Sequence, residues 1–139
     1  MNEQQNTALI RKEYDAFGRG DIQTILDNLT EDVEWGLEGP ESIPFAGKKK
    51  GPAQVRTFFE ALGGTLQDMK LSMDTFVAQG DHVATMGRFS ATVVATGRSF
   101  DAPIAHFFTV RNGKISRFVD FTDTAATVEA YTKTSAASR

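Results

Sequence analysis

The chain has 139 residues, of which 40% are hydrophobic and 24% charged, and its formal net charge is −3. These values are typical of a single globular domain and exclude wholesale disorder. The negative charge argues against nucleic acid as a partner, because binding to phosphates needs a concentrated basic face. The absence of cysteine excludes disulfides, thiolate catalysis and cysteine-based zinc sites.

The N-terminal segment and the small number of histidines limit the possible location and cofactors of the protein. The segment is polar, and the chain has neither a signal-peptide stretch nor a transmembrane span, so we expect a cytoplasmic protein without membrane contact. Two histidines do not supply the usual three or four ligands of a metal site. No glycine-rich nucleotide loop follows a strand. We therefore expect neither a metal ion nor a cofactor.

Two amphipathic helices are predicted at the start of the chain. Ile10, Tyr14 and Phe17 recur at helical spacing, which predicts a helix from about residue 5 to residue 17. Glycines at positions 18 and 20 end this helix. Asp21 has the short carboxylate side chain of an N-cap, and apolar residues at helical spacing follow it. A second helix therefore follows the first almost directly.

A short strand and a third helix come next. Alternation over residues 33–37 predicts a strand that contains Trp35. The loop that follows carries Phe45 and a basic run at residues 48–50, which we interpret as solvated. Pro52 is suited to the first turn of a helix, and Gly63-Gly64 to its end.

The second half of the chain has the period of strands. Apolar alternation predicts strands over about residues 69–77, 83–95, 104–110 and 115–121. The turns between them are of the hairpin type, so the strands form an antiparallel meander. Asp123 is expected to cap a short last helix.

Helices followed by a meander predict an α+β fold with the helices on one face of the sheet. We expect one domain over residues 1–139, with an ordered core of about residues 5–131 and a flexible tail at 132–139. The other face of the sheet is left open, and a second copy of the chain is the simplest cover for an apolar face. The sequence therefore predicts a homodimer through the sheet face.

Four segments carry a family resemblance: Ala16-Phe17-Gly18-Arg19-Gly20-Asp21, Glu31-Asp32-Val33-Glu34-Trp35, Gly51-Pro52, and Arg111-Asn112-Gly113-Lys114-Ile115 leading to Asp120. In this order they resemble the nuclear transport factor 2-like (NTF2-like) superfamily, specifically its SnoaL-like branch, which contains polyketide cyclases. The likeness extends over residues 5–131. It implies a cone-shaped, curved antiparallel sheet packed with N-terminal helices around an apolar pocket. Function in such folds depends on the pocket residues.

Two enzyme types of this superfamily match the chain poorly. Ketosteroid isomerases use a tyrosine, a carboxylate base and a carboxylic acid at positions that hold other residues here, Glu13, Leu37 and Ala105. Limonene-type epoxide hydrolases carry an arginine and an aspartate where this chain has Arg88 and Asp120. Ser90, however, takes the place of their second carboxylate. Water addition to an epoxide would then need Glu13 or Asp101 in the pocket.

The third type, the SnoaL-type aldol cyclases, matches best. These enzymes carry an acid/base aspartate on the last strand and a histidine on the strand before it, as Asp120 and His106 do here. Asp120 also has apolar neighbours, so burial would raise its pKa and make it a proton acceptor near neutral pH. Alternatively, the carboxylate pairs with Arg117 or Arg88, or caps nearby backbone.

His106 and Arg88 are the predicted partners of Asp120. A three-residue hairpin loop over residues 111–113 places His106 opposite Phe118 and on the same face as Asp120, whereas a two-residue turn places His106 and Asp120 on opposite faces. The sequence allows both turns. Arg88 either holds Asp120 ionised and stabilises an enolate oxygen, or extends to the sheet edge and water.

We expect the pocket to bind a small hydrophobic molecule. Tyr14 either offers its hydroxyl to a ligand or is buried and bonded elsewhere in the fold. The other candidate ligand-binding residues, some of which are ordinary core, are Trp35, Phe45, Phe58, Phe59, Met73, Met86, Ser90 and Phe118. The predicted function is a cofactor-independent isomerase, cyclase or lyase acting on a small hydrophobic carbonyl compound, with Asp120, His106 and Arg88 as its catalytic residues. The alternatives are a non-catalytic ligand-binding or dimerisation module and water addition to an epoxide.

Overall fold

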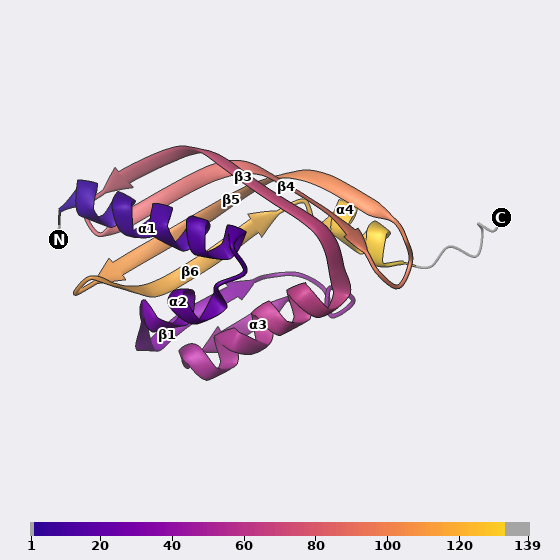
Figure 1. Cartoon of the computed structure of the whole chain (residues 1–139), viewed down its shortest axis with the longest axis horizontal. Helices are drawn as coiled ribbons and strands as arrows, with labels where there is room; N and C mark the ends of the chain where they lie inside the picture. The colour runs from indigo at the N-terminus through magenta and orange to yellow at the C-terminus, as the bar shows by residue number, and fades with distance from the viewer. Residues whose placement is uncertain (1, 133–139) are drawn as a thin grey trace.

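The computed structural model describes residues 2–132 and shows a curved, six-stranded sheet with helices packed against it (Figure 1). The helices are α1 (Glu3–Gly18), α2 (Ile22–Asp27), α3 (Gly51–Thr65) and α4 (Thr124–Tyr131). The strands are β1 (Leu29–Leu37), β2 (Gly47–Lys50), β3 (Leu66–Gln79), β4 (His82–Val93), β5 (Ser99–Arg111) and β6 (Lys114–Thr122). Apart from Thr132, the predicted flexible tail lies outside the described residues.

The first two helices begin at side-chain caps. α1 starts earlier than predicted because Asn2 and Gln5 form a capping box, in which the Asn2 side chain accepts from the Gln5 backbone N–H at 2.8 Å. Asp21 caps α2 as predicted and accepts from the backbone N–H of Thr24 at 3.2 Å. The connection between the helices is short, so α2 packs directly against the end of α1.

The third and fourth helices begin where the sequence predicts. Pro52 lies in the first turn of α3, and Asp123 caps α4. The prediction that Gly63-Gly64 ends α3 is wrong: the helix continues to Thr65. Neither glycine has a positive φ, so neither provides the left-handed turn by which glycine usually ends a helix.

The strands β3 to β6 form the predicted meander, and β1 pairs with it in a different way. β3, β4, β5 and β6 pair in chain order, each antiparallel to the next. β1, in contrast, lies parallel to β6, with Trp35 opposite Phe118. The sheet is therefore mixed, and the expectation of a wholly antiparallel sheet is corrected at this edge. A parallel pair needs a long crossover, which α3 and the strands β3–β5 supply.

The basic run at residues 48–50 was predicted to be a loop, but it forms most of the edge strand β2. This strand pairs antiparallel with β1, and Lys49 lies opposite Trp35. Gly36 permits the close approach, because a Cβ at this position would lie 2.7 Å from the Gly47 carbonyl oxygen. Lysines on an edge strand discourage pairing with a further chain.

The helices enclose the hydrophobic core against one face of the sheet. α1 packs on β3 and β4, α3 packs on β1, and α4 lies against β5 at the other end of the sheet (Figure 1). Large apolar side chains on the opposite face remain exposed, among them Val77, Met86 and Phe121. None of the helices described is long and apolar enough to cross a membrane.

Candidate functional site

A narrow apolar cavity of about 70 Å³ lies between the helices and the sheet. Side chains from all four helices and from all strands except β2 contribute to its walls, and most of them are aromatic or aliphatic. The volume exceeds what one water molecule needs, so side chains do not fill the space completely. Polar groups on the wall are few, and they include Glu13, Tyr14, His106 and Asp120.

His106 and Asp120 are direct neighbours in the cavity wall. They lie opposite each other on β5 and β6, and each side chain is less than a tenth exposed. The imidazole Nε2 lies 3.7 Å from the carboxyl Oδ1, too far for a hydrogen bond but close enough for a small rearrangement to make one. The predicted partnership of these two residues therefore has a geometric basis.

Their register differs from both sequence-based alternatives. Asn112 and Gly113, with φ of 52° and 78°, form a two-residue turn, and Arg111 pairs with Lys114. Val110 pairs with Ile115, but Thr109 pairs with Arg117, so Ser116 is the extra residue of a β-bulge.

With the two-residue turn alone, the side chains of β6 that face the cavity would point to the opposite face of the sheet. The bulge shifts β6 by one further residue and so restores their inward orientation. His106 therefore lies opposite Asp120, and Phe118 lies opposite Phe108. The predicted pairing of His106 with Phe118 is wrong by two residues, one from the shorter turn and one from the bulge, although Phe118 does line the cavity.

Burial determines the charge states of the pair. Removal from water raises the pKa of Asp120 to about 7 and lowers the pKa of His106 to about 3. At neutral pH the imidazole is thus neutral, while the carboxyl is close to half ionised. The two groups form a neutral or singly charged acid/base pair and not a salt bridge.

A hydrogen-bonded chain extends from His106 to α1 and β4. The Tyr14 hydroxyl lies 2.7 Å from Nδ1 of His106 and 2.6 Å from Oγ1 of Thr85. Burial raises the pKa of Tyr14, so its hydroxyl stays protonated. When Tyr14 donates to Nδ1, the proton of the neutral ring is on Nε2 and points toward Asp120; when Tyr14 donates to Thr85, Nε2 is free to accept a proton.

Three buried polar atoms on the cavity wall lack a hydrogen-bond partner among residues 2–132: Glu13 Oε1, Trp35 Nε1 and Asp120 Oδ1. Buried polar groups in folded proteins are nearly always satisfied, and unsatisfied ones are costly. All three atoms belong to residues that line one cavity, so a polar group of a bound molecule there is one means of satisfying them.

Glu13, which the sequence analysis proposed only as a possible second carboxyl for epoxide hydrolysis, lines the cavity. Its Oε2 accepts a hydrogen bond from Nδ2 of Asn28 at 2.9 Å, and burial raises its pKa to about 7. The available signal was its spacing: Glu13 lies three residues after Ile10 and four before Phe17, on the apolar stripe of α1. A carboxylate on such a stripe predicts a buried acid.

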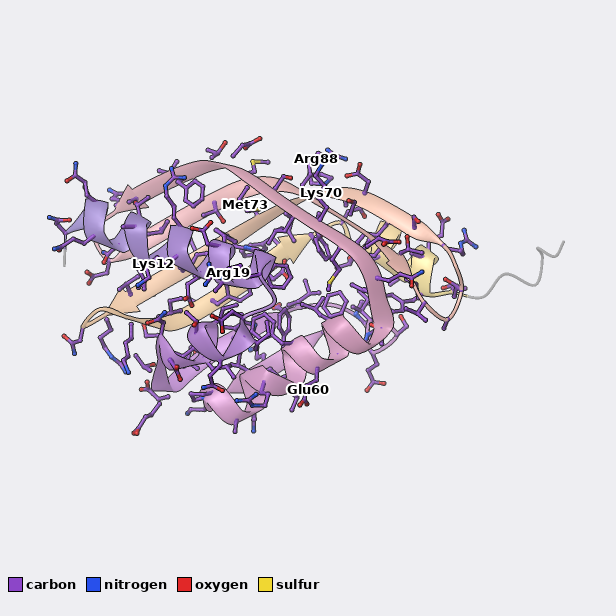
Figure 2. All side chains as sticks on the ribbon, viewed as in Figure 1. Lys12, Arg19, Glu60, Lys70, Met73 and Arg88 are labelled. Atoms are coloured by element: carbon purple, nitrogen blue, oxygen red, sulfur yellow. The ribbon has the colours of Figure 1, made fainter. Side chains whose placement is uncertain are left out.

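Arg88 does not reach the cavity. Its side chain is 58% exposed on the outer face of the sheet and forms an ion pair with Asp101, 3.0 Å from Nε to Oδ1. Figure 2 shows it pointing away from the helices. The neighbours Gly87 and Phe89 face inward, so strand alternation requires Arg88 to face outward. The expectation that Arg88 contacts Asp120 is corrected accordingly.

The predicted aromatic wall is largely in place. Trp35, Phe45, Phe58, Phe59 and Phe118 all line the cavity, and the Trp35 and Phe118 rings stack with centroids 4.1 Å apart. Phe89, Phe100, Ile104 and Phe108 from the meander complete the wall, and the sequence analysis did not single them out.

Three predicted ligand-binding residues lie elsewhere. Met86 is 54% exposed on the outer face of the sheet, and Ser90, on the same face of β4, lines a shallow surface hollow. Met73 lines a groove between α1 and β3 that adjoins the cavity. Cavity and groove share five wall residues: Tyr14, Phe17, Phe59, Leu62 and Leu71.

The described part of the chain contains no group of three or more histidine, aspartate or glutamate side chains placed to hold a metal ion. The site therefore consists of two buried carboxyls, a neutral imidazole, a tyrosine hydroxyl and an indole N–H in apolar surroundings. Such groups are suited to moving protons and to holding the oxygens of a small molecule.

The chain belongs to the family of SnoaL-like domains, whose pattern matches residues 10–118. Solved structures share the fold over almost the whole chain. An NTF2-like protein from Burkholderia xenovorans is 28% identical, with a TM-score of 0.85 over 95% of this chain and 99% of its own. An NTF2-like protein of unknown function from Burkholderia pseudomallei is 29% identical, with a TM-score of 0.84 and the same coverage.

A third similar structure is that of TerC, co-crystallised with polyporic acid. TerC is 30% identical to this chain, with a TM-score of 0.83 over 91% of this chain and 98% of TerC. No curated protein matches the chain.

Proposed function

We propose that this protein is a cofactor-independent acid/base enzyme, an isomerase, cyclase or lyase, that acts on a small hydrophobic carbonyl compound in the cavity. The observation that carries the proposal is Asp120: a buried carboxyl with a pKa of about 7, an unpartnered oxygen and His106 beside it, on the wall of an apolar cavity. A base with this pKa combines proton affinity with a useful ionised fraction at neutral pH.

In the proposed step, the Asp120 carboxylate accepts a proton from the carbon next to the substrate carbonyl. The C–H electron pair forms a new C=C bond, and the carbonyl π pair moves onto oxygen to give an enolate. In an isomerase the proton then returns to a different carbon. In a cyclase the enolate carbon bonds to a second carbonyl carbon, whose oxygen takes the proton from Asp120, and a lyase follows this sequence in reverse.

Other cavity residues support the same step. His106 relays the proton that Asp120 holds, because its Nε2 faces the carboxyl and its tautomer switches through Tyr14 and Thr85. Trp35 Nε1–H is a buried donor without a partner among the described residues. It donates to the enolate oxygen, the role predicted for Arg88, which does not reach the cavity. The co-crystal of TerC with polyporic acid supports a small-molecule ligand for this fold.

The test uses acetophenone as a probe and measures deuterium exchange at its methyl group in D₂O by proton NMR. We expect Asp120→Asn to slow the catalysed exchange by about 100-fold or more, because it removes the base. The matched control is Asp81→Asn, which changes an exposed aspartate in the β3–β4 turn. An Asp120→Asn protein that folds and exchanges as fast as the wild type would rule out Asp120 as the base, and a wild type that does not accelerate the exchange would leave only a non-catalytic ligand-binding module.

Glu13 favours a second candidate, water addition to an epoxide, because it supplies the second carboxyl that Ser90 does not. One carboxylate would then activate water while the other acid protonates the epoxide oxygen. Styrene oxide in H₂¹⁸O distinguishes the two candidates: formation of labelled diol supports hydrolysis, and unchanged epoxide beside active ketone exchange rejects it.

We also propose a homodimer through the outer face of the sheet. Met86, Ala105 and Phe121 lie directly opposite one another across β4, β5 and β6, and Met86 and Phe121 are each more than half exposed. A continuous apolar row of this kind is typical of a surface that a partner covers. A cytoplasmic location remains our expectation from the sequence.

A further inference from the structure

We propose that Glu13 binds a hydroxyl group of the substrate, so that the substrate class is a compact hydroxyketone and not a simple ketone. This inference rests on the proposed function for the carbonyl end of the molecule. It adds a second polar contact, separate from Asp120, that selects which carbonyl compounds bind.

The first support is that Glu13 is held in one orientation with one oxygen left over. The side chain is 5% exposed, and Oε2 accepts from Nδ2 of Asn28 at 2.9 Å. Asn28 is fixed in turn, because it forms the C-cap of α2 and its Nδ2 also donates to the Thr24 carbonyl at 3.1 Å. Glu13 lines the cavity, and residues 2–132 offer its buried Oε1 no partner.

The second support is the difference in chemistry between the unpartnered groups. The indole N–H of Trp35 only donates, so its partner must be an acceptor such as a carbonyl oxygen. Oε1 of Glu13 accepts when ionised and donates when protonated, since Oε2 is already engaged by Asn28. A hydroxyl group satisfies either state, because it both donates and accepts, whereas a hydrocarbon satisfies neither.

A purely structural role for Glu13 fits these observations poorly. A buried carboxyl with one oxygen left unpartnered destabilises the fold, because that oxygen has lost its water without gaining a hydrogen bond. Binding sites built to hydrogen-bond a substrate hydroxyl discriminate strongly against analogues that lack it, because the buried group is then left unpaired. Glu13 has the features of such a selecting group.

The experiment measures binding and not turnover, so it is independent of the exchange assay. The probes are acetophenone and its three monohydroxylated ring isomers, and dissociation constants are measured by ligand-observed NMR. We expect the wild type to bind at least one hydroxy isomer about 10-fold or more tighter than acetophenone. Glu13→Met should abolish this preference and leave acetophenone binding no weaker.

The control variant is Glu60→Gln, which changes a glutamate on the solvent side of α3 (Figure 2) and should keep the full preference. Should Glu13→Met fail to fold, Glu13→Gln preserves the shape, and its preference should fall at least about threefold. The proposal is overturned if the wild type prefers none of the hydroxy isomers, or if the folded Glu13 variants prefer them as strongly as the wild type does. Failure of acetophenone exchange with an intact hydroxyl preference would reject the catalytic proposal alone.

Discussion

His106 and Asp120 lie directly opposite each other on β5 and β6, with Nε2 3.7 Å from Oδ1 and both side chains buried. Burial moves their pKa values in opposite directions, to about 3 for His106 and about 7 for Asp120. Both shifts favour the uncharged forms, so the two residues do not form a stable ion pair and a proton can pass between them. The charge states have consequences that can be measured without knowing the substrate.

The first consequence is a pH-dependent stability. The Asp120 carboxyl binds its proton more tightly in the folded protein, with a pKa of about 7, than in the unfolded chain, with a pKa of 3.8. Its contribution to stability is therefore largest below pH 4 and is lost as the pH rises to about 7. We expect the wild type to lose about 2 kcal/mol relative to Asp120→Asn between pH 5 and pH 8, measured by urea unfolding.

His106 has the opposite sign, because its folded pKa lies below the unfolded value of 6.5, and it adds stability as the pH rises from about 3 to 6.5. Both proteins carry His106, so the difference between them isolates Asp120. Unfolding free energies that change in parallel with pH would contradict a buried carboxyl at position 120.

The second prediction concerns the tautomer of His106. At pH 5 its ring should remain neutral, because its pKa is about 3, and ¹⁵N NMR should show one protonated and one bare ring nitrogen. At pH 8 the protonated nitrogen should be Nε2, which faces the Asp120 carboxylate. Tyr14→Phe removes the hydroxyl beside Nδ1 and should alter the Nδ1 signal most. Two protonated nitrogens in the wild type at pH 5 would mean that the pair is ionic.

A third prediction tests the close packing of β3 on β4. A Cβ at Gly87 would lie 1.9 Å from the Ser72 carbonyl oxygen, so Gly87→Ala must push the strands apart and should destabilise the fold by about 3 kcal/mol. Gly63→Ala is the matched control on α3, where the added methyl meets nothing within 4 Å. This variant should be stabilised by up to about 1 kcal/mol. Equal thermal unfolding of the two variants would contradict the register of β3 and β4.

The fourth prediction concerns the outer face of the sheet. Phe121→Glu places a charge in the apolar row with Met86 and Ala105, and we expect it to convert a dimer to a monomer. Val94→Glu is the control, because Val94 is also exposed but lies just beyond the end of β4. Sedimentation equilibrium measures the mass of both variants and of the wild type. A monomeric wild type at high concentration would reject the dimer.

Local signals predicted much of the fold. Asp21 and Asp123 were recognisable as caps because an N-cap depends on one side chain and the following turn, and the meander was recognisable because its alternation and hairpin turns are local. The pairing of β1 with β6 and the strand β2 were missed. Both depend on contacts between segments far apart in the chain, for which a single sequence contains no direct signal.

The site was predicted in part for the same reason. The side-chain facing of His106 and Asp120 depends on the bulge at Ser116, and a serine in a strand gives no distinctive signal for a bulge. The prediction for Arg88 was wrong, although the alternation along β4 indicated its orientation. Arg88 shares a face with Ser90 and Thr92, while apolar residues such as Val83 and Phe89 occupy the other face. The alternation of side chains along β4 predicted the orientation of Arg88 better than the resemblance to epoxide hydrolases did.

The pH dependence of acetophenone exchange tests the central claim most directly. If the Asp120 carboxylate is the base, the rate catalysed by the wild type should rise with pH, reach half its maximum near pH 7 and level off above pH 8. Glu13 also has a pKa of about 7, so the profile is measured in Glu13→Gln as well, which should keep the same midpoint. A rate that persists in Asp120→Asn with this midpoint would contradict the account.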